Sequence, residues 1–107
     1  MTFYIKQNDT SPSIVAELKD GSDVAIDLTD ATVRFHMRKI GSDSVVTDQP
    51  ALIVTPLTGL VRYNWSSSDT QNIGSYQAEF EVTFVNYSVE TFPNNRFIEV
   101  EITDDIT

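Results

Sequence analysis

The stretch Ser75–Val85, SYQAEFEVTFV, decides the fold. Apolar and polar side chains alternate along its length, and the apolar ones are Tyr76, Ala78, Phe80, Val82 and Phe84. Successive side chains of a β-strand point to opposite faces, so this alternation predicts a long strand with one buried and one wet face. Such a strand belongs at the centre of a half-buried sheet.

Shorter segments repeat the same period of two. They are Val33–Arg38, residues 51–55, residues 60–65 and Phe97–Ile102. Residues 51–55 and 60–65 flank Pro56–Gly59, a turn with an early proline and a final glycine, and this order predicts a hairpin. Residues 14–28 predict another hairpin, because the pair Asp20-Gly21 suits a tight turn.

Helical patterns are scarce in this sequence. The one candidate, residues 66–71, is polar throughout and long enough for a single turn at most. Several short strands at spacings of about 8–12 residues, with turn signals between them, predict an all-β sandwich or barrel. The length fits one domain over residues 1–107, without room for a second core.

Composition and charge exclude several classes of function. The chain has 107 residues, with 7 basic and 16 acidic side chains, a net charge of −9 and no cysteine. A disulfide framework, a thiolate zinc site and a cysteine nucleophile are therefore excluded. The negative charge disfavours nucleic acid as a partner, because phosphate neutralisation supplies most non-specific affinity.

Membrane and export segments are also not predicted. No apolar run approaches the roughly 18 residues of a spanning helix, so we expect no membrane partner. The first nine residues, Met1–Asp9, contain three consecutive bulky apolar side chains, far fewer than the roughly 7–15 of an export signal. The sequence thus predicts synthesis in the cytoplasm.

Catalytic chemistry finds little support in the sequence. His36 is the only histidine, it falls on the polar face of its strand, and no nucleophile motif accompanies it. We expect no catalytic residues, no cofactor and no enzyme activity.

Calcium is the metal that the acidic residues suggest. They are Asp20, Asp23, Asp27 and Asp30, with Asp104 and Asp105 near the end of the chain. Their spacing does not match a calcium loop, and aspartate is favoured in turns for backbone reasons alone. We therefore predict no metal site.

The aromatic residues predict the core. We expect Phe35, Trp65 and Phe80 at its centre, joined by Tyr76, Phe84, Phe92 and Phe97 from other strands. Tyr4, Tyr63 and Tyr87 are left as surface aromatics, which are too few for a sugar-binding platform.

A group of three residues resembles the tyrosine corner of immunoglobulin-like sandwiches. It consists of Asp69, Gly74 and Tyr76, in which a tyrosine at the start of a late strand bonds back across the preceding turn. The role of such a corner is packing. This group favours an immunoglobulin-like antiparallel β-sandwich of about seven to nine strands.

The order of these segments resembles the N-terminal domain of the phage baseplate upper protein family. The matching runs are Phe3–Thr10, Val33–Arg38, Gly59–Trp65, Asp69-Thr70 with Gly74–Phe80, and Glu90–Asn94. The strongest part is the strand G-x-Y-x-A-E-F-E-V followed by a hairpin and T-F-P-N. The resemblance implies an immunoglobulin-like sandwich that acts as a structural protein of the virion.

The resemblance also implies how the protein works. It suggests a tail or baseplate assembly module, made in the host cytoplasm, that docks a fibre or receptor-binding protein onto the particle. Its partners would be other virion proteins, and symmetric virion positions would favour a homo-oligomeric arrangement. Family members usually continue into further segments, so we expect an excised domain or a small stand-alone virion protein.

Two points stay open in the sequence. The contact surface is expected at the edge near Tyr4–Lys6 or at the hairpin tip Asn86–Ser88. A carbohydrate-binding or adhesive β-sandwich module, in which calcium bridges acidic side chains to a glycan, is the alternative function.

Overall fold

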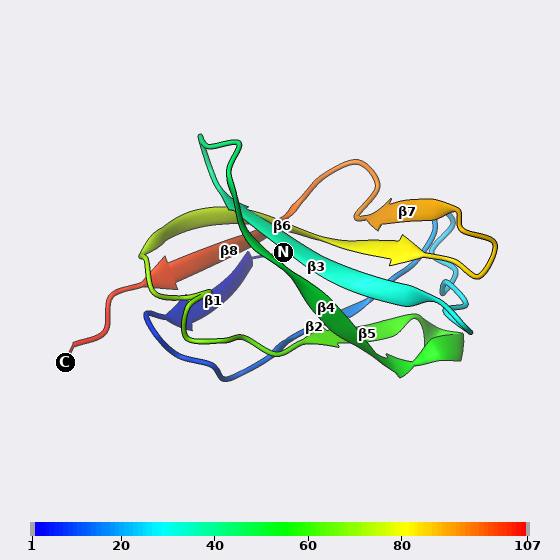
Figure 1. Cartoon of the computed structure of the whole chain (residues 1–107), viewed down its shortest axis with the longest axis horizontal. Coiled ribbons are helices and arrows are strands. Elements are labelled where there is room, and N and C mark those ends of the chain that lie inside the picture. Colours follow the sequence, from blue (N-terminus) through cyan, green and yellow to red (C-terminus); the bar gives the residue numbers. More distant parts are fainter. Residues whose placement is uncertain (1, 107) are drawn as a thin grey trace.

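The strand predicted from residues 75–85 lies at the centre of the fold. The computed structural model describes residues 2–106, and in this range the sheet contains eight strands (Figure 1). They are β1 Thr2–Lys6, β2 Ile14–Glu17, β3 Thr32–Lys39, β4 Val45–Thr55, β5 Leu60–Tyr63, β6 Gly74–Thr83, β7 Val89–Phe92 and β8 Ile98–Thr103. A short 3₁₀ helix, η1 Pro56–Thr58, joins β4 to β5.

The strands follow the order β1-β8-β6-β3-β4-β5-β2, and β7 also pairs with β6. In the β3–β6 ladder Phe35 faces Phe80 and Met37 faces Ala78, so the apolar residues of both strands share one face. This agrees with the alternation of apolar and polar residues in Ser75–Val85 and Val33–Arg38. The predicted all-β sandwich class is confirmed.

Strand β4 belongs to both layers of the sandwich (Figure 1). Its first part, up to Ala51, pairs with β3, and its last part, from Leu52, pairs with β5. The register shifts between Ile53 and Thr55, and such a shift bends a strand. One continuous strand therefore links the two layers, which gives the sandwich a nearly closed, barrel-like form.

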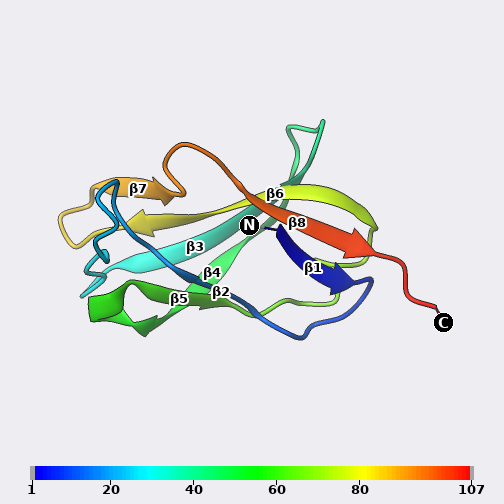
Figure 2. The same ribbon diagram turned by 180° about the vertical axis from the view of Figure 1, so that it is seen from behind.

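One strand pair departs from the predicted antiparallel arrangement. β1 and β8 run parallel, with Thr2 beside Glu99 and Lys6 beside Thr103. Figure 2 shows the two arrows side by side and pointing the same way. Parallel neighbours need a long connection between them, and here almost the whole chain supplies it.

The predicted hairpin over residues 14–28 forms only beside its turn, and the predicted partner of residues 14–17 is wrong. Its turn forms, because Asp20 Oδ1 accepts hydrogen bonds from the N–H groups of Ser22 and Val24. After the single bridge between Lys19 and Ala25, however, the two arms separate. β2 pairs instead with β5, over Ile14–Glu17 and Leu60–Tyr63.

Aromatic rings fill the space between the layers. Phe35 and Phe80 are fully buried and Trp65 is 4% exposed. The Phe35 ring stacks on Tyr63 with centroids 4.4 Å apart and meets Trp65 and Phe80 edge-on at 5.4 and 5.2 Å. Offset and edge-on pairs of this kind are each worth about 0.5–1.5 kcal/mol beyond the area that they bury.

Two aromatic residues do not lie where the sequence places them. Tyr63, expected at the surface, is buried, because its hydroxyl has a hydrogen-bonding partner inside the protein. Phe97, expected in the core, is 40% exposed and lies under the Arg38 guanidinium, 5.2 Å from the ring centroid. Phe84 is half-buried against the core, and Tyr76 and Phe92 are buried.

The residues of the expected tyrosine corner lie before and within the first part of β6. The Tyr76 hydroxyl donates to the Asn72 carbonyl at 2.7 Å, a bond of the form that a tyrosine corner takes. Burial raises the pKa of Tyr76. Gly74 has a φ of 147°, which side chains with a Cβ rarely adopt.

Asp69 has a different role from the one that its position before Tyr76 suggested. Its carboxylate accepts hydrogen bonds from Tyr63 Oη at 2.5 Å, Thr47 Oγ1 at 3.0 Å and the Ser66 N–H at 2.8 Å. Burial, the hydrogen bond to Asp69 and the Asp69 charge raise the pKa of Tyr63. Asp69 thus fixes the turn after β5 to β4 and β5.

Candidate functional site

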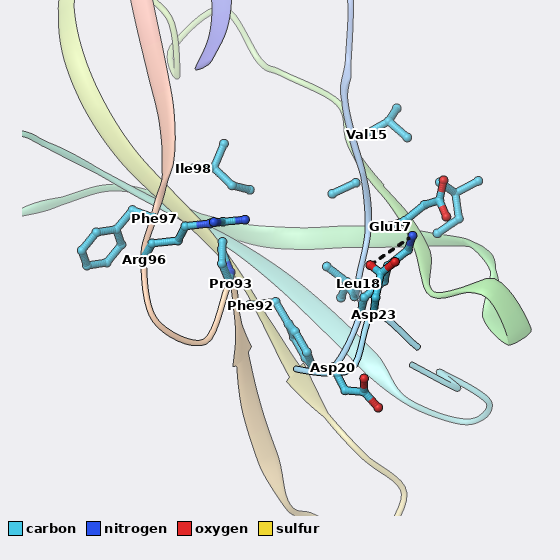
Figure 3. Close-up of a pocket in the computed structure, with 13 residues that line it drawn as sticks. Val15, Glu17, Leu18, Asp20, Asp23, Phe92, Pro93, Arg96, Phe97 and Ile98 are labelled. Carbon is cyan, nitrogen blue, oxygen red and sulfur yellow. Dashed lines mark ion pairs between the residues drawn. The ribbon is translucent and has the colours of Figure 1, made fainter. Parts of the chain in front are cut away.

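A cleft of about 530 Å³ opens at the seam of the sandwich (Figure 3). One wall is formed by residues 15–20, together with Asp23 and Leu60, and the other by Phe92, Pro93 and residues 96–98. The first wall includes the free edge of β2, and the second is the connection between β7 and β8. The cleft therefore lies between the last strand of one layer and the connection into β8 of the other.

The wall formed by β2 offers free backbone groups. The Leu18 N–H donates to the Gly59 carbonyl at 2.8 Å, which continues the β2–β5 register by one pair. Backbone groups alternate between the two edges of a strand, so those of Ala16 face β5 and those of Val15 and Glu17 face away from it. The N–H groups of Val15 and Glu17 have no hydrogen-bonding partner among residues 2–106.

The charged side chains of the cleft lie on both walls. Lys19 forms an exposed ion pair with Asp23 at 3.6 Å, worth little by itself. Arg96 extends from the opposite wall toward β2 (Figure 3), and no ion pair engages it in the described part of the chain. The other charged residues of the lining are Glu17 and Asp20.

His36 lies outside the cleft, on the polar outer face of β3. Its Nε2 is 3.1 Å from Asp48 Oδ1 and its Nδ1 is 3.9 Å from Glu79. Arg34 Nε donates to the same Asp48 oxygen at 2.7 Å, and this hydrogen bond holds the pKa of Asp48 below its ordinary value. His36 thus lies in a surface cluster of polar side chains with Arg34 and Asp48.

The aspartates that suggested calcium belong to turns. Asp20 accepts the two backbone bonds described above, and Asp27 Oδ1 accepts from both the hydroxyl and the N–H of Thr29. These bonds from Thr29 lower the pKa of Asp27. Among residues 2–106, no three acidic or histidine side chains are grouped as metal ligands.

The two surface sites expected from the sequence lie on different elements. Tyr4 is exposed on β1, at one end of the strand order, and Tyr87 is exposed in the turn between β6 and β7. Across residues 2–106, no helical segment has the length and apolar character needed to traverse a membrane.

Sequence reasoning did not find the cleft. Its main elements are the backbone of Val15 and Glu17 and the side chain of Arg96. A strand edge becomes free only through its pairing, and the sequence predicted the wrong partner for β2. The single signal available was the cluster of Pro93, Arg96 and Phe97 ahead of the last strand.

Comparison with solved structures gives the class of fold. The N-terminal domain of phage TP901-1 ORF48 is similar with a TM-score of 0.70 and 14% identity, over 96% of this chain and 85% of that chain. CopC from Methylosinus trichosporium OB3b is similar with a TM-score of 0.52 and 9% identity, over 99% of this chain and 87% of that chain. At these identities the likeness concerns the fold alone. No curated protein matches the chain.

The family follows from the sequence itself. The model of the BppU N-terminal domain matches residues 3–106. The chain therefore belongs to the family of baseplate upper protein N-terminal domains, as the resemblance of its motifs predicted. Membership supports a structural role in a phage tail or baseplate, interaction with other virion proteins and a non-enzymatic function.

Proposed function

We propose that this domain is an assembly module that docks a peripheral component, a fibre or receptor-binding protein, onto the phage tail. The observation that carries the proposal is the family match over residues 3–106. The structure is compatible with it, because the surface offers free strand edges and a peptide-sized cleft. Such features suit protein–protein contacts.

A nonsense codon in the gene for this chain tests the proposal. Purified particles are compared with wild-type particles by mass spectrometry and negative-stain microscopy. We expect tails that lack this protein and a fibre or receptor-binding protein, together with loss of adsorption to the host. Particles of otherwise unchanged composition that adsorb normally would contradict the docking role.

Copy number belongs to the same proposal. Symmetric positions in the virion place several copies around the tail axis, which favours a homo-oligomeric arrangement in the particle. Quantitative mass spectrometry of purified tails, calibrated against a tail protein of known copy number, measures it. A single copy per particle would contradict this part of the proposal.

No specific feature favours the carbohydrate-binding alternative. Tyr4 and Tyr87 lie on separate elements, and Asp20 and Asp27 are engaged in turns. Glycan arrays probed with the purified chain, with and without calcium, give a direct test. Calcium-dependent binding to a defined glycan would replace docking as the main function.

A further inference from the structure

The free edge of β2 is unusual for an exposed strand. Natural proteins protect free edges with proline, charge, bulges or covering segments. The edge of β2 contains no proline, its single charged side chain is Glu17, and its backbone groups face the cleft. It is therefore a template to which another extended chain can pair.

The cleft has the walls that an added strand requires. An extended segment directs alternate side chains to one side. On the inner side it would lie against the exposed parts of Phe92 and Ile98, which are 3% and 7% exposed, and on the outer side it would pass Val15, which is 47% exposed. Main-chain hydrogen bonds to an edge with apolar pockets for alternate side chains are the basis of recognition by strand addition.

The basic side chains of the cleft indicate which charge the bound segment carries. The Arg96 guanidinium has no ion-pair partner within residues 2–106 and reaches across the cleft (Figure 3), whereas Lys19 is paired with Asp23. A carboxylate on the incoming strand can satisfy Arg96 with two parallel hydrogen bonds. The occupant is thus an extended segment with alternating apolar side chains and one acidic residue.

A second copy of this chain fits the cleft poorly. Two copies joined edge to edge at β2 would bring Glu17 and Asp20 of one close to those of the other. A segment of another protein avoids this repulsion where it places apolar side chains beside Glu17 and Asp20 and its one carboxylate beside Arg96.

We infer that the cleft between β2 and residues 92–98 receives an extended, acidic-apolar segment of another virion protein, which adds to β2 as a new edge strand. The segment pairs with the backbone of Val15 and Glu17, and its carboxylate meets Arg96. This inference rests on the proposed docking function and names the surface and the partner chemistry.

Hydrogen exchange on reconstituted tails tests the backbone pairing. Tails purified from the nonsense mutant are mixed with the full chain, and amide exchange is compared with that of the free chain. We expect the Val15 and Glu17 amides to slow by at least about tenfold on binding. Ala16, whose amide already faces β5, is the internal control. Bound protein with unchanged exchange at Val15 and Glu17 would overturn the inference.

Two variants test the contacts by their incorporation into the same tails. Val15→Pro removes an N–H that faces the partner and leaves the β5 ladder intact, while Val15→Thr keeps that N–H. Arg96→Glu reverses the cleft charge, and Lys39→Glu makes the same change of charge outside the cleft. We expect Val15→Pro and Arg96→Glu to weaken incorporation by at least about tenfold, Val15→Thr to weaken it less than Val15→Pro, and the control Lys39→Glu to bind like the wild type.

The outcomes separate the two proposals. If the wild-type chain fails to bind the mutant tails, the docking function itself is wrong. If it binds and Arg96→Glu and Val15→Pro bind equally well, docking stands and the cleft is not its site. Circular dichroism checks that each variant is folded. If Val15→Pro does not fold, Arg96→Glu alone decides between these outcomes.

Discussion

Asp69 joins three parts of the chain through one carboxylate. It accepts hydrogen bonds from β4 at Thr47, from β5 at Tyr63 and from the following turn at Ser66. Replacement by alanine leaves these donors without an acceptor in a mostly buried place. We expect Asp69→Ala to lower the free energy of unfolding by about 3 kcal/mol, measured by urea denaturation.

A matched control separates this network from a general effect of charge. Asp43 is exposed in the loop after β3. We expect Asp43→Ala to change the free energy of unfolding by less than about 0.5 kcal/mol. Equal effects of the two substitutions would contradict the role of Asp69.

The hydroxyl of Tyr63 makes stability sensitive to alkaline pH. Burial and Asp69 raise its pKa in the folded state above the unfolded value of about 10. The group therefore contributes stability that is complete below about pH 10 and is lost as the pH rises further. We expect the free energy of unfolding to fall more steeply between pH 10 and 11 in the wild type than in Tyr63→Phe. Parallel profiles for the two proteins would contradict this.

Gly59 is the residue that allows β5 to begin next to the Leu18 segment. Its φ is +66°, and a Cβ there would lie 2.5 Å from the Leu18 carbonyl oxygen. We expect Gly59→Ala to cost about 2–4 kcal/mol in thermal or urea unfolding. Gly41 has a φ of +87°, and a Cβ added there would meet no atom within 4 Å. Gly41→Ala therefore measures the cost of the backbone conformation alone, which we expect to be about 1–2 kcal/mol. Equal losses in the two variants would contradict the close approach.

Strands were predictable where apolar and polar residues alternate without interruption. β6 and β3 follow from their alternation, and the hairpin of β4 and β5 follows from the Pro56–Gly59 turn. The partner of β2 was not predictable, because an Asp-Gly turn is equally compatible with a hairpin and with two arms that separate. Here the Leu18 carbonyl still accepts from the Ile26 N–H, but the Leu18 N–H donates to Gly59, and β2 pairs with β5.

The same limit applies to the candidate site. A cleft between β2 and the β7–β8 connection depends on which strands lie at the ends of the sheet. The order of strands in the sheet cannot be predicted from local sequence, because strand pairing depends on contacts between segments that are distant in the chain. The core was easier to predict. Phe35 and Phe80 lie in segments where apolar and polar residues alternate, and both are buried on the same face, whereas the burial of Tyr63 depends on the turn residue Asp69.

The whole molecule is expected to unfold as one unit. β4 pairs with β3 in one layer and with β5 in the other. Unfolding of either layer therefore removes a strand from the other layer as well. Trp65, at the interface of the layers, reports on packing, and far-ultraviolet circular dichroism reports on the sheet. We expect the two urea transitions to coincide, as two-state behaviour requires. Separate midpoints would show that the layers unfold independently.

The parallel pairing of β1 and β8 has a mechanical consequence. Tension applied along the strands at Thr2 and Thr103 slides the two strands past each other, so the hydrogen bonds across the five residue pairs of this ladder are loaded at once. In an antiparallel hairpin pulled at its open end, such bonds would open one after another. β1 and β8 thus form a shear-loaded clamp, which would suit the docking function proposed above if the domain carries force between the tail and the component that it holds.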